Sequence, residues 1–132
     1  MSVAGVSADP SEIKAMVNWP PPTNLKDLRG FLGLTGYYRK FVAGYSQIAG
    51  PLIHFLRKDS FRWDTEALQA FEMLKHAMTH VTVLALPDFT KPFVLEYDAS
   101  GFGVGAVLMQ EQRPIAYFSQ VLAPQARSKS VY

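Results

Sequence analysis

The chain has 132 residues, of which 48% are hydrophobic and 18% charged, and its formal net charge is +2. This composition supports one folded domain, or one and a half, and excludes a disordered tail. The charge permits contact with nucleic acid without requiring it. The chain has no cysteine, which excludes disulfides and thiolate metal sites and fits an intracellular protein, cytoplasmic or nuclear. No apolar run approaches the roughly 20 residues of a membrane span, and the first residues lack the pattern of a signal peptide.

The beginning of the chain is predicted to be a leader over residues 1–23. Asp9 or Ser11 is suited to cap a short helix, because a side-chain oxygen there accepts from the first turn. That helix must end before Trp19-Pro-Pro-Pro22, since consecutive prolines cannot donate backbone hydrogen bonds. The prolines therefore predict a stiff, extended connector.

The region 24–80 is predicted to be helical. Thr23 or Asn24 is the expected cap of a helix whose apolar stripe runs over 25–42, with Gly44 as its end. A shorter helix is predicted over 46–56. Asp64 is the expected cap of a third, because its carboxylate precedes another run with helical spacing.

At Val81 the apolar period changes from helical to alternating. Three short strands are predicted over 93–98, 103–110 and 115–119, and the tight turns between them indicate an antiparallel meander. We therefore predict an α+β fold, with a helical half followed by a three-stranded β region over 81–132.

The leading candidate for chemistry is Asp98, at the end of the first of these strands. The strand is predicted to be buried, and its alternation places Glu96 on the same face as Asp98. A divalent Mg²⁺ site for phosphodiester cleavage needs several carboxylates, because one carboxylate binds a hard ion weakly. The alternative is an acid that caps the turn Asp98-Ala-Ser-Gly101, and the bare pattern favours that alternative.

Two weaker patterns involve glycine and histidine. Gly101, Gly103 and Gly105 do not match a dinucleotide or Walker fingerprint, and they favour a turn followed by close backbone packing. His76 and His80 are four residues apart on one helix and could share a metal ion. No Glu stands between them in a zincin pattern, which favours a solvated helix face.

A basic and aromatic cluster, Tyr37-Tyr38-Arg39-Lys40-Phe41, suggests contact with nucleic acid. Arg39 and Lys40 could meet phosphates while the ring of Tyr37 packs on sugar or base. The alternative is a helix whose aromatic side chains belong to the core and whose cations are solvated. That alternative is favoured for Tyr38 and Phe41 and leaves Arg39 and Lys40 open.

Five stretches taken together resemble one family. They are Asp9-Pro-Ser-Glu-Ile-Lys-Ala-Met-Val-Asn-Trp-Pro20, Leu28-Arg-Gly-Phe-Leu-Gly-Leu-Thr-Gly-Tyr-Tyr-Arg-Lys-Phe41, Ile48-Ala-Gly-Pro-Leu52, Leu84-Ala-Leu-Pro-Asp-Phe89 and Tyr97-Asp-Ala-Ser100. In this order, over nearly the whole chain, they are similar to the polyprotein of gypsy-class long-terminal-repeat retrotransposons. The resemblance implies thumb-like and connecting helices over 24–80, which hold the primer–template. It also implies the first three strands of a truncated ribonuclease H (RNase H) fold over 92–122.

The resemblance also implies roles for single residues. Asp98 would be the first acid of the family's metal-binding carboxylates, which overturns the turn-acid interpretation. The polymerase signature Tyr-x-Asp-Asp is absent from the chain, and the RNase H site needs further acids on a helix and strands after Tyr132. We therefore expect neither parental activity and no cofactor for this chain, although the parent enzyme would use Mg²⁺.

Three hypotheses for function follow. The first is a non-catalytic fragment or remnant of a reverse transcriptase–ribonuclease H that binds RNA–DNA hybrid weakly or the remainder of the polyprotein. The second is a domesticated host interaction module that self-associates through an open sheet edge or an uncovered apolar face. The third is a residual Mg²⁺-dependent ribonuclease H, in which Asp98 and Glu96 act alone or through a dimer that supplies more acids.

Overall fold

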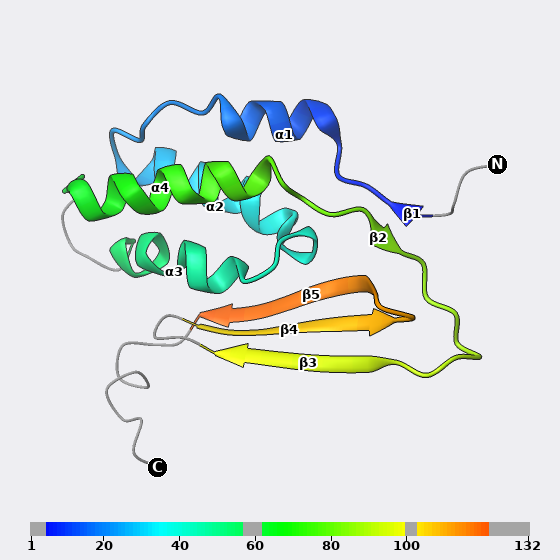
Figure 1. Cartoon of the computed structure of the whole chain (residues 1–132). Helices are drawn as coiled ribbons and strands as arrows, with labels where there is room; N and C mark the ends of the chain where they lie inside the picture. Colours follow the sequence, from blue (N-terminus) through cyan, green and yellow to red (C-terminus); the bar gives the residue numbers. More distant parts are fainter. Residues whose placement is uncertain (1–4, 57–61, 100–102, 122–132) are drawn as a thin grey trace, which may run out of the picture.

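The computed structural model describes residues 5–56, 62–99 and 103–121. Within these ranges four α-helices precede a three-stranded sheet, which confirms the predicted α+β class (Figure 1). In chain order the elements are β1 (Gly5–Val6), α1 (Pro10–Val17), α2 (Leu25–Tyr37), the 3-10 turn η1 (Arg39–Phe41), α3 (Tyr45–Phe55), α4 (Thr65–Met78), β2 (Leu84–Ala85), β3 (Val94–Ala99), β4 (Gly103–Gln110) and β5 (Arg113–Val121). Every helix in the described ranges is too short or too polar to cross a lipid bilayer.

Side-chain caps determine where three of the helices begin. The side chains of Asp9, Asn24 and Asp64 accept backbone N–H groups in the first turns of α1, α2 and α4, at 2.8 to 2.9 Å. The sequence predicted Asp64 alone as a cap, and it left two candidates for each of the other starts, Asp9 or Ser11 and Thr23 or Asn24. α3 has no side-chain cap bond and instead follows Gly44, whose φ of +68° is a left-handed conformation that favours glycine.

The helix α2 is shorter than predicted. It ends at Tyr37 and is followed by η1, whereas the apolar stripe predicted one continuous helix as far as Val42. Tyr38, Phe41 and Val42 are nevertheless buried. The apolar stripe shows which positions are buried and does not show the type of helix. A 3-10 turn can direct the same side chains into the core as an α-helix would, so the stripe continued past the end of α2.

Aromatic side chains hold the helices together. Phe31 of α2 and Phe71 of α4 are fully buried, with their ring centroids 4.7 Å apart. Trp19 packs against Phe31 at 5.9 Å and Trp63 packs against Phe71 at 5.7 Å, so the segments that flank the helices join the same core.

The three long strands form an antiparallel meander in the order β3–β4–β5, as predicted. Asp98 lies opposite Gly105, and Glu96 lies opposite Val107. The turn between β4 and β5 is made by residues 111–112, which both have positive φ, as in a type I′ hairpin.

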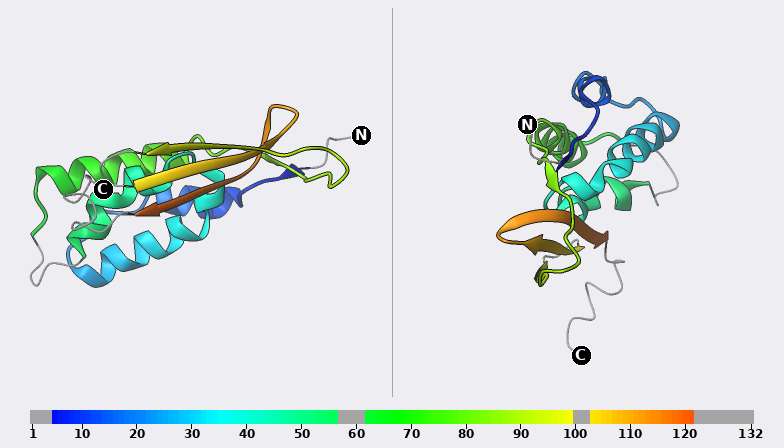
Figure 2. Two further views of the ribbon diagram at one scale, coloured as in Figure 1. Left: turned by 90° about the horizontal axis from the view of Figure 1, so that it is seen from below. Right: turned by 90° about the vertical axis from the view of Figure 1, so that its right-hand side faces the viewer.

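One face of this sheet packs on α3, and the helices lie on that side (Figures 1 and 2). Gly103 and Gly105 form the contact: an added Cβ would lie 2.9 Å from Ser46 Cβ at Gly103 and 3.1 Å from Gln47 Nε2 at Gly105. Since paired residues share a face, Asp98 lies on the helix side with Gly105.

The opposite face of the sheet is apolar, and no helix of the described residues covers it (Figure 2). Leu95, Tyr97 and Phe118 lie there and are 46%, 73% and 54% exposed. All of β3 is exposed, which corrects the prediction of a buried strand. Alternating apolar residues predict that a strand has an apolar face, but they do not predict that another element covers this face. Among the described strands β3 has only β4 as a neighbour, so it is an edge strand.

A second, two-stranded sheet was not predicted. β1 pairs antiparallel with β2, with Gly5 opposite Ala85 and Val6 opposite Leu84. This pairing joins the segment before α1 to the segment after α4. The division of the chain into 1–23, 24–80 and 81–132 stays a prediction. Arg57-Lys58-Asp59-Ser60, whose charges predict a turn, and Pro124, which suits the start of another helix, lie outside the described residues.

Candidate functional site

A cavity of about 170 Å³ lies between the sheet and the start of α3. Glu96 and Asp98 of β3 line it together with Gln47 of α3. The structure therefore brings together the two acids that the strand alternation had paired. Both acids belong to an exposed strand.

Gln47 is the member of this cavity that sequence reasoning missed. Its Oε1 is buried and has no hydrogen-bond partner among the described residues. Its place depends on how α3 packs over Gly105, where no side chain competes for the space. No local pattern in the sequence reports such a packing contact.

Two carboxylates of the described residues, Glu96 and Asp98, line this cavity. Among the described residues no group of three or more His, Cys, Asp and Glu side chains is placed to hold a metal ion. The uncapped first turn of α3 also lies here, since Gly44 lines the cavity. Free N–H groups at a helix start carry partial positive charge, which works against a bound cation. We therefore assign no metal-dependent step to these residues.

The predicted basic and aromatic cluster is divided between surface and core. Tyr37 is 76% exposed, and its ring meets the edge of Tyr38 with 5.1 Å between centroids. Tyr37 and Lys40 line a cavity of about 460 Å³ between η1 and the segment before α1. Tyr38 and Phe41 are buried, as the core interpretation predicted.

Two members of the cluster make contacts that join other elements. The Tyr38 hydroxyl donates to Glu12 of α1, and this hydrogen bond is the main cause that raises the pKa of Tyr38 to about 12. Arg39 Nη2 donates to the Ser119 carbonyl of β5 at 3.2 Å, and its guanidinium lies 5.4 Å from the centre of the Tyr45 ring. Arg39 thus connects the helices to the sheet, whereas Tyr37 and Lys40 face solvent.

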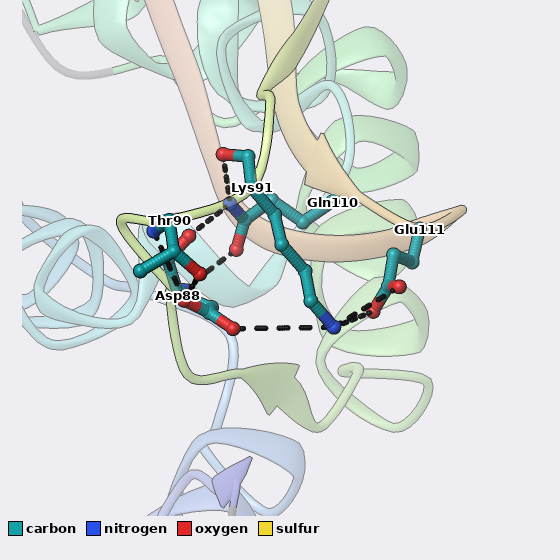
Figure 3. Close-up of polar contacts among 5 residues, drawn as sticks. All are labelled: Asp88, Thr90, Lys91, Gln110 and Glu111. Carbon is teal, nitrogen blue, oxygen red and sulfur yellow. Dashed lines mark hydrogen bonds and ion pairs between the residues drawn. The ribbon is translucent and has the colours of Figure 1, made fainter.

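The loop that leads into β3 is held by a polar network (Figure 3). Gln110 is 5% exposed; its Oε1 accepts from Asp88 N at 2.8 Å, and its Nε2 donates to the carbonyls of Asp88 at 2.7 Å and Lys91 at 3.0 Å. Lys91 Nζ lies 3.2 Å from both carboxylate oxygens of Glu111. Thr90 donates twice to Asp88 Oδ1, which lowers the pKa of Asp88. The network positions the strand that carries both acids.

The structure also places the histidine pair and two of the three glycines that the sequence singled out. His76 and His80 do lie together, with ring centroids 4.5 Å apart. Gly103 and Gly105 pack closely against α3, as predicted, while Gly101 lies outside the described residues.

Comparisons with known proteins agree with this fold. The sequence model of the family described as an RNase H-like domain found in reverse transcriptase matches residues 63–132. The chain is 46% identical over 121 residues to the retrovirus-related Pol polyprotein from transposon 297 of Drosophila melanogaster, covering 89% of this chain and 11% of that protein. It is 36% identical over 135 residues to the Pol polyprotein from transposon gypsy of the same species, covering 92% and 13%. An uncharacterized mitochondrial protein of Arabidopsis thaliana is 55% identical over 94 residues, covering 71% and 60%.

Solved structures with the same fold come from a foamy viral protease–reverse transcriptase. Its complex with an RNA/DNA hybrid has a TM-score of 0.79 at 26% identity and covers 92% of this chain and 17% of that chain. Its complex with double-stranded DNA has a TM-score of 0.78 at the same identity, with 26% of that chain covered. The chain spans about a tenth of the length of the Pol polyproteins it matches. The chain therefore belongs to the RNase H-like domain family found in reverse transcriptases and corresponds to a segment of retroelement Pol polyproteins.

Proposed function

We propose that this chain is a segment of a gypsy-class reverse transcriptase–ribonuclease H polyprotein that binds RNA–DNA hybrid weakly and does not cleave it. Residues 24–80 act as a thumb-like and connecting region, and residues 81–132 begin the RNase H-like domain. Similarity to the transposon gypsy polyprotein over 92% of the chain supports the class. The foamy viral relative, which shares the fold, was solved with double-stranded DNA and with RNA/DNA hybrid.

The exposed ring of Tyr37 beside Lys40 carries the binding proposal. Tyr37 is 76% exposed although it directly precedes the buried Tyr38, so its ring is available to a partner. Stacking of a base or sugar on such a ring is worth about 1–3 kcal/mol. Lys40 on the same cavity adds a charge for a phosphate, while Arg39 contributes less because it already binds the Ser119 carbonyl.

Fluorescence anisotropy of a labelled RNA–DNA hybrid tests this surface. We expect weak binding by the wild type that falls as salt rises, because Lys–phosphate contacts release counterions. Lys40→Ala should weaken binding and make it less salt-dependent, and Tyr37→Ala should weaken it at every salt concentration. Lys26→Ala removes one exposed cation from the far end of α2 and is the matched control. Equal losses for Lys26→Ala and Lys40→Ala, or binding indifferent to salt, would count against the proposal.

The absence of cleavage is proposed because two-metal hydrolysis needs several carboxylates to hold ions roughly 4 Å apart. The cavity brings together Asp98 and Glu96, with the uncapped start of α3 beside them. Gel analysis of a labelled hybrid with Mg²⁺ should therefore show no cleavage by the wild type. Cleavage that disappears in Asp98→Asn would instead establish a residual ribonuclease H and refute this part of the proposal.

The outer face of the sheet favours a second candidate function, a self-associating interaction module. Leu95, Tyr97 and Phe118 form an exposed apolar surface on the outer face of the sheet. Exposed apolar surfaces of this kind recruit partners, and two sheets can stack face to face at about 10 Å. We propose a second copy of the chain as the partner, which would suit a retroelement segment retained by a host.

A further inference from the structure

His76 and His80 lie at the C-terminal end of α4, away from the cavities described above. Their ring centroids are 4.5 Å apart, and both side chains are exposed. His80 lies just beyond the end of α4, but Thr79, the C-cap residue, keeps right-handed helical backbone angles. The two histidines therefore lie side by side as an i, i+4 pair does within a helix. Two imidazoles at this separation on one face can present a ring nitrogen each to the same ion.

Hydrogen bonds select the tautomer of His80. The Thr79 hydroxyl donates its hydrogen to the His76 carbonyl at 2.6 Å. His80 Nδ1 lies 2.8 Å from that hydroxyl oxygen and 3.1 Å from the same carbonyl oxygen. A carbonyl oxygen only accepts, so Nδ1 carries the ring hydrogen. In the neutral ring the lone pair is then on Nε2, and metal-binding histidines commonly donate their other ring N–H to a backbone carbonyl in this way.

The local electrostatics favour a cation. The C-terminal end of a helix carries partial negative charge from carbonyls that have no partner within the helix. Glu72 precedes His76 by one turn on the same stripe of α4. The neighbouring ammonium of Lys75 is bound to the Trp19 carbonyl at 3.0 Å and lies 4.8 Å from the centre of the Phe71 ring. The hydrogen bond to Trp19 holds the Lys75 ammonium at the connector that follows α1.

We propose that His76 and His80 form a two-imidazole site for a divalent late transition-metal ion, Zn²⁺ or Cu²⁺, at the end of α4. Imidazole nitrogens suit these ions, and affinity rises along the first-row series toward Cu²⁺. Because no third His, Asp or Glu of the described residues joins the pair, water completes the coordination. A bound ion would fix the turn that leads from α4 toward β2.

Calorimetric titration of the untagged protein with ZnCl₂ tests the site, with CuCl₂ as a second probe. We expect one ion per chain, and His76→Asn and His80→Asn should each lower the affinity at least about tenfold, because the second imidazole binds intramolecularly. His54→Asn removes a histidine from α3 and should leave the affinity unchanged. Wild-type affinity in either His76→Asn or His80→Asn would overturn the proposal, because separate imidazoles would then explain the binding.

The tautomer gives an independent readout. Nitrogen NMR of the metal-free protein should show His80 with its hydrogen on Nδ1, and Zn²⁺ should shift the Nε2 resonances of both His76 and His80. Thr79→Val removes the hydroxyl partner and should lower the Zn²⁺ affinity by up to roughly tenfold. A hydrogen on Nε2 of His80 in the metal-free protein, or Zn²⁺ shifts confined to one ring, would contradict the geometry.

Discussion

Single side chains fix the positions of segments that regular hydrogen-bond ladders do not reach, and Gln110 is the clearest case. It occupies the last position of β4 and is almost fully buried, yet it satisfies three backbone groups of the loop before β3. A buried polar group left without a partner costs more than a hydrogen bond gains, so the contribution of Gln110 is asymmetric. Its removal would leave three backbone groups of the loop without this partner.

Gln110→Leu should lower the free energy of unfolding by about 2–3 kcal/mol, because three hydrogen bonds are lost while the side-chain volume is retained. Urea denaturation followed by circular dichroism measures the change. Gln69→Leu makes the same substitution at an exposed position of α4 and should change stability by less than about 0.5 kcal/mol. Equal losses for the two variants would show that the network of Figure 3 does not hold the loop.

The raised pKa of Tyr38 predicts that the stability of the fold depends on pH in the alkaline range. The hydrogen bond to Glu12 raises the pKa of Tyr38 from 10.0 to about 12. Between these values the unfolded chain loses the phenolic proton first, so the contribution is complete below pH 10 and is lost as the pH rises toward 12. Thermal unfolding from pH 9 to pH 11.5 should show this decline in the wild type and a smaller one in Tyr38→Phe. Tyr37→Phe, at the exposed neighbour, should decline like the wild type, and identical curves for all three proteins would refute the assignment.

The glycines of β4 allow a close contact between α3 and the sheet. An added Cβ at Gly103 would lie 2.9 Å from both the Gln120 carbonyl oxygen and Ser46 Cβ. At Gly33, on the exposed side of α2, an added Cβ would meet nothing within 4 Å. The same substitution should therefore have opposite effects at the two positions.

Gly103→Ala should lower the free energy of unfolding by about 1–3 kcal/mol, because the backbone carbonyl cannot give way without moving β5. Gly33→Ala should raise it by up to about 1 kcal/mol, since alanine is the better helix former and the site is open. Urea denaturation of both variants gives the two values. A stabilising Gly103→Ala would mean that α3 does not rest on the sheet at this point.

Local signals made most of these elements predictable. The starts of α1, α2 and α4 follow from cap residues, and the meander follows from alternation with short turns. The end of α2 was wrong because buried positions recur in a 3-10 turn as they do in an α-helix. The β1–β2 pair was missed because each of these strands has only two residues. So short a strand shows no alternation of apolar and polar side chains that could be recognised in the sequence.

The candidate site was predictable only where its residues share a strand. Glu96 and Asp98 are two residues apart on one strand, where side chains alternate between the two faces. This alternation alone predicts that both side chains lie on the same face. Gln47 reaches the same cavity through the packing of α3 on β4, a contact between distant parts of the chain. The burial of β3 was wrong for a related reason, since alternation describes a strand but not what lies over it.

Within the described residues one face of the β3–β4–β5 sheet packs on α3 and the other is not covered by a helix, and this asymmetry of the whole molecule predicts its behaviour in solution. Light scattering should show an average mass that rises with concentration, as outer sheet faces from two copies meet. Leu95→Lys places a charge in that surface and should reduce the association. Leu68→Lys makes the same change on α4, at a residue with similar exposure, and should not. A single monomeric species at all concentrations would exclude the interaction module.

The pairing of β1 with β2 imposes an order on biosynthesis. Gly5 leaves the ribosome before any of the four helices, but its partner Ala85 is made only after all of them. At synthesis rates of about 5–20 residues per second, the first strand waits several seconds for the second. All four described helices are complete before β2 is made, so the contact between Phe31 and Phe71 can form before β1 finds its partner. Leu84 and Ala85 therefore pair with β1 only after all four described helices have been synthesised, and this pairing then links the two ends of the helical region.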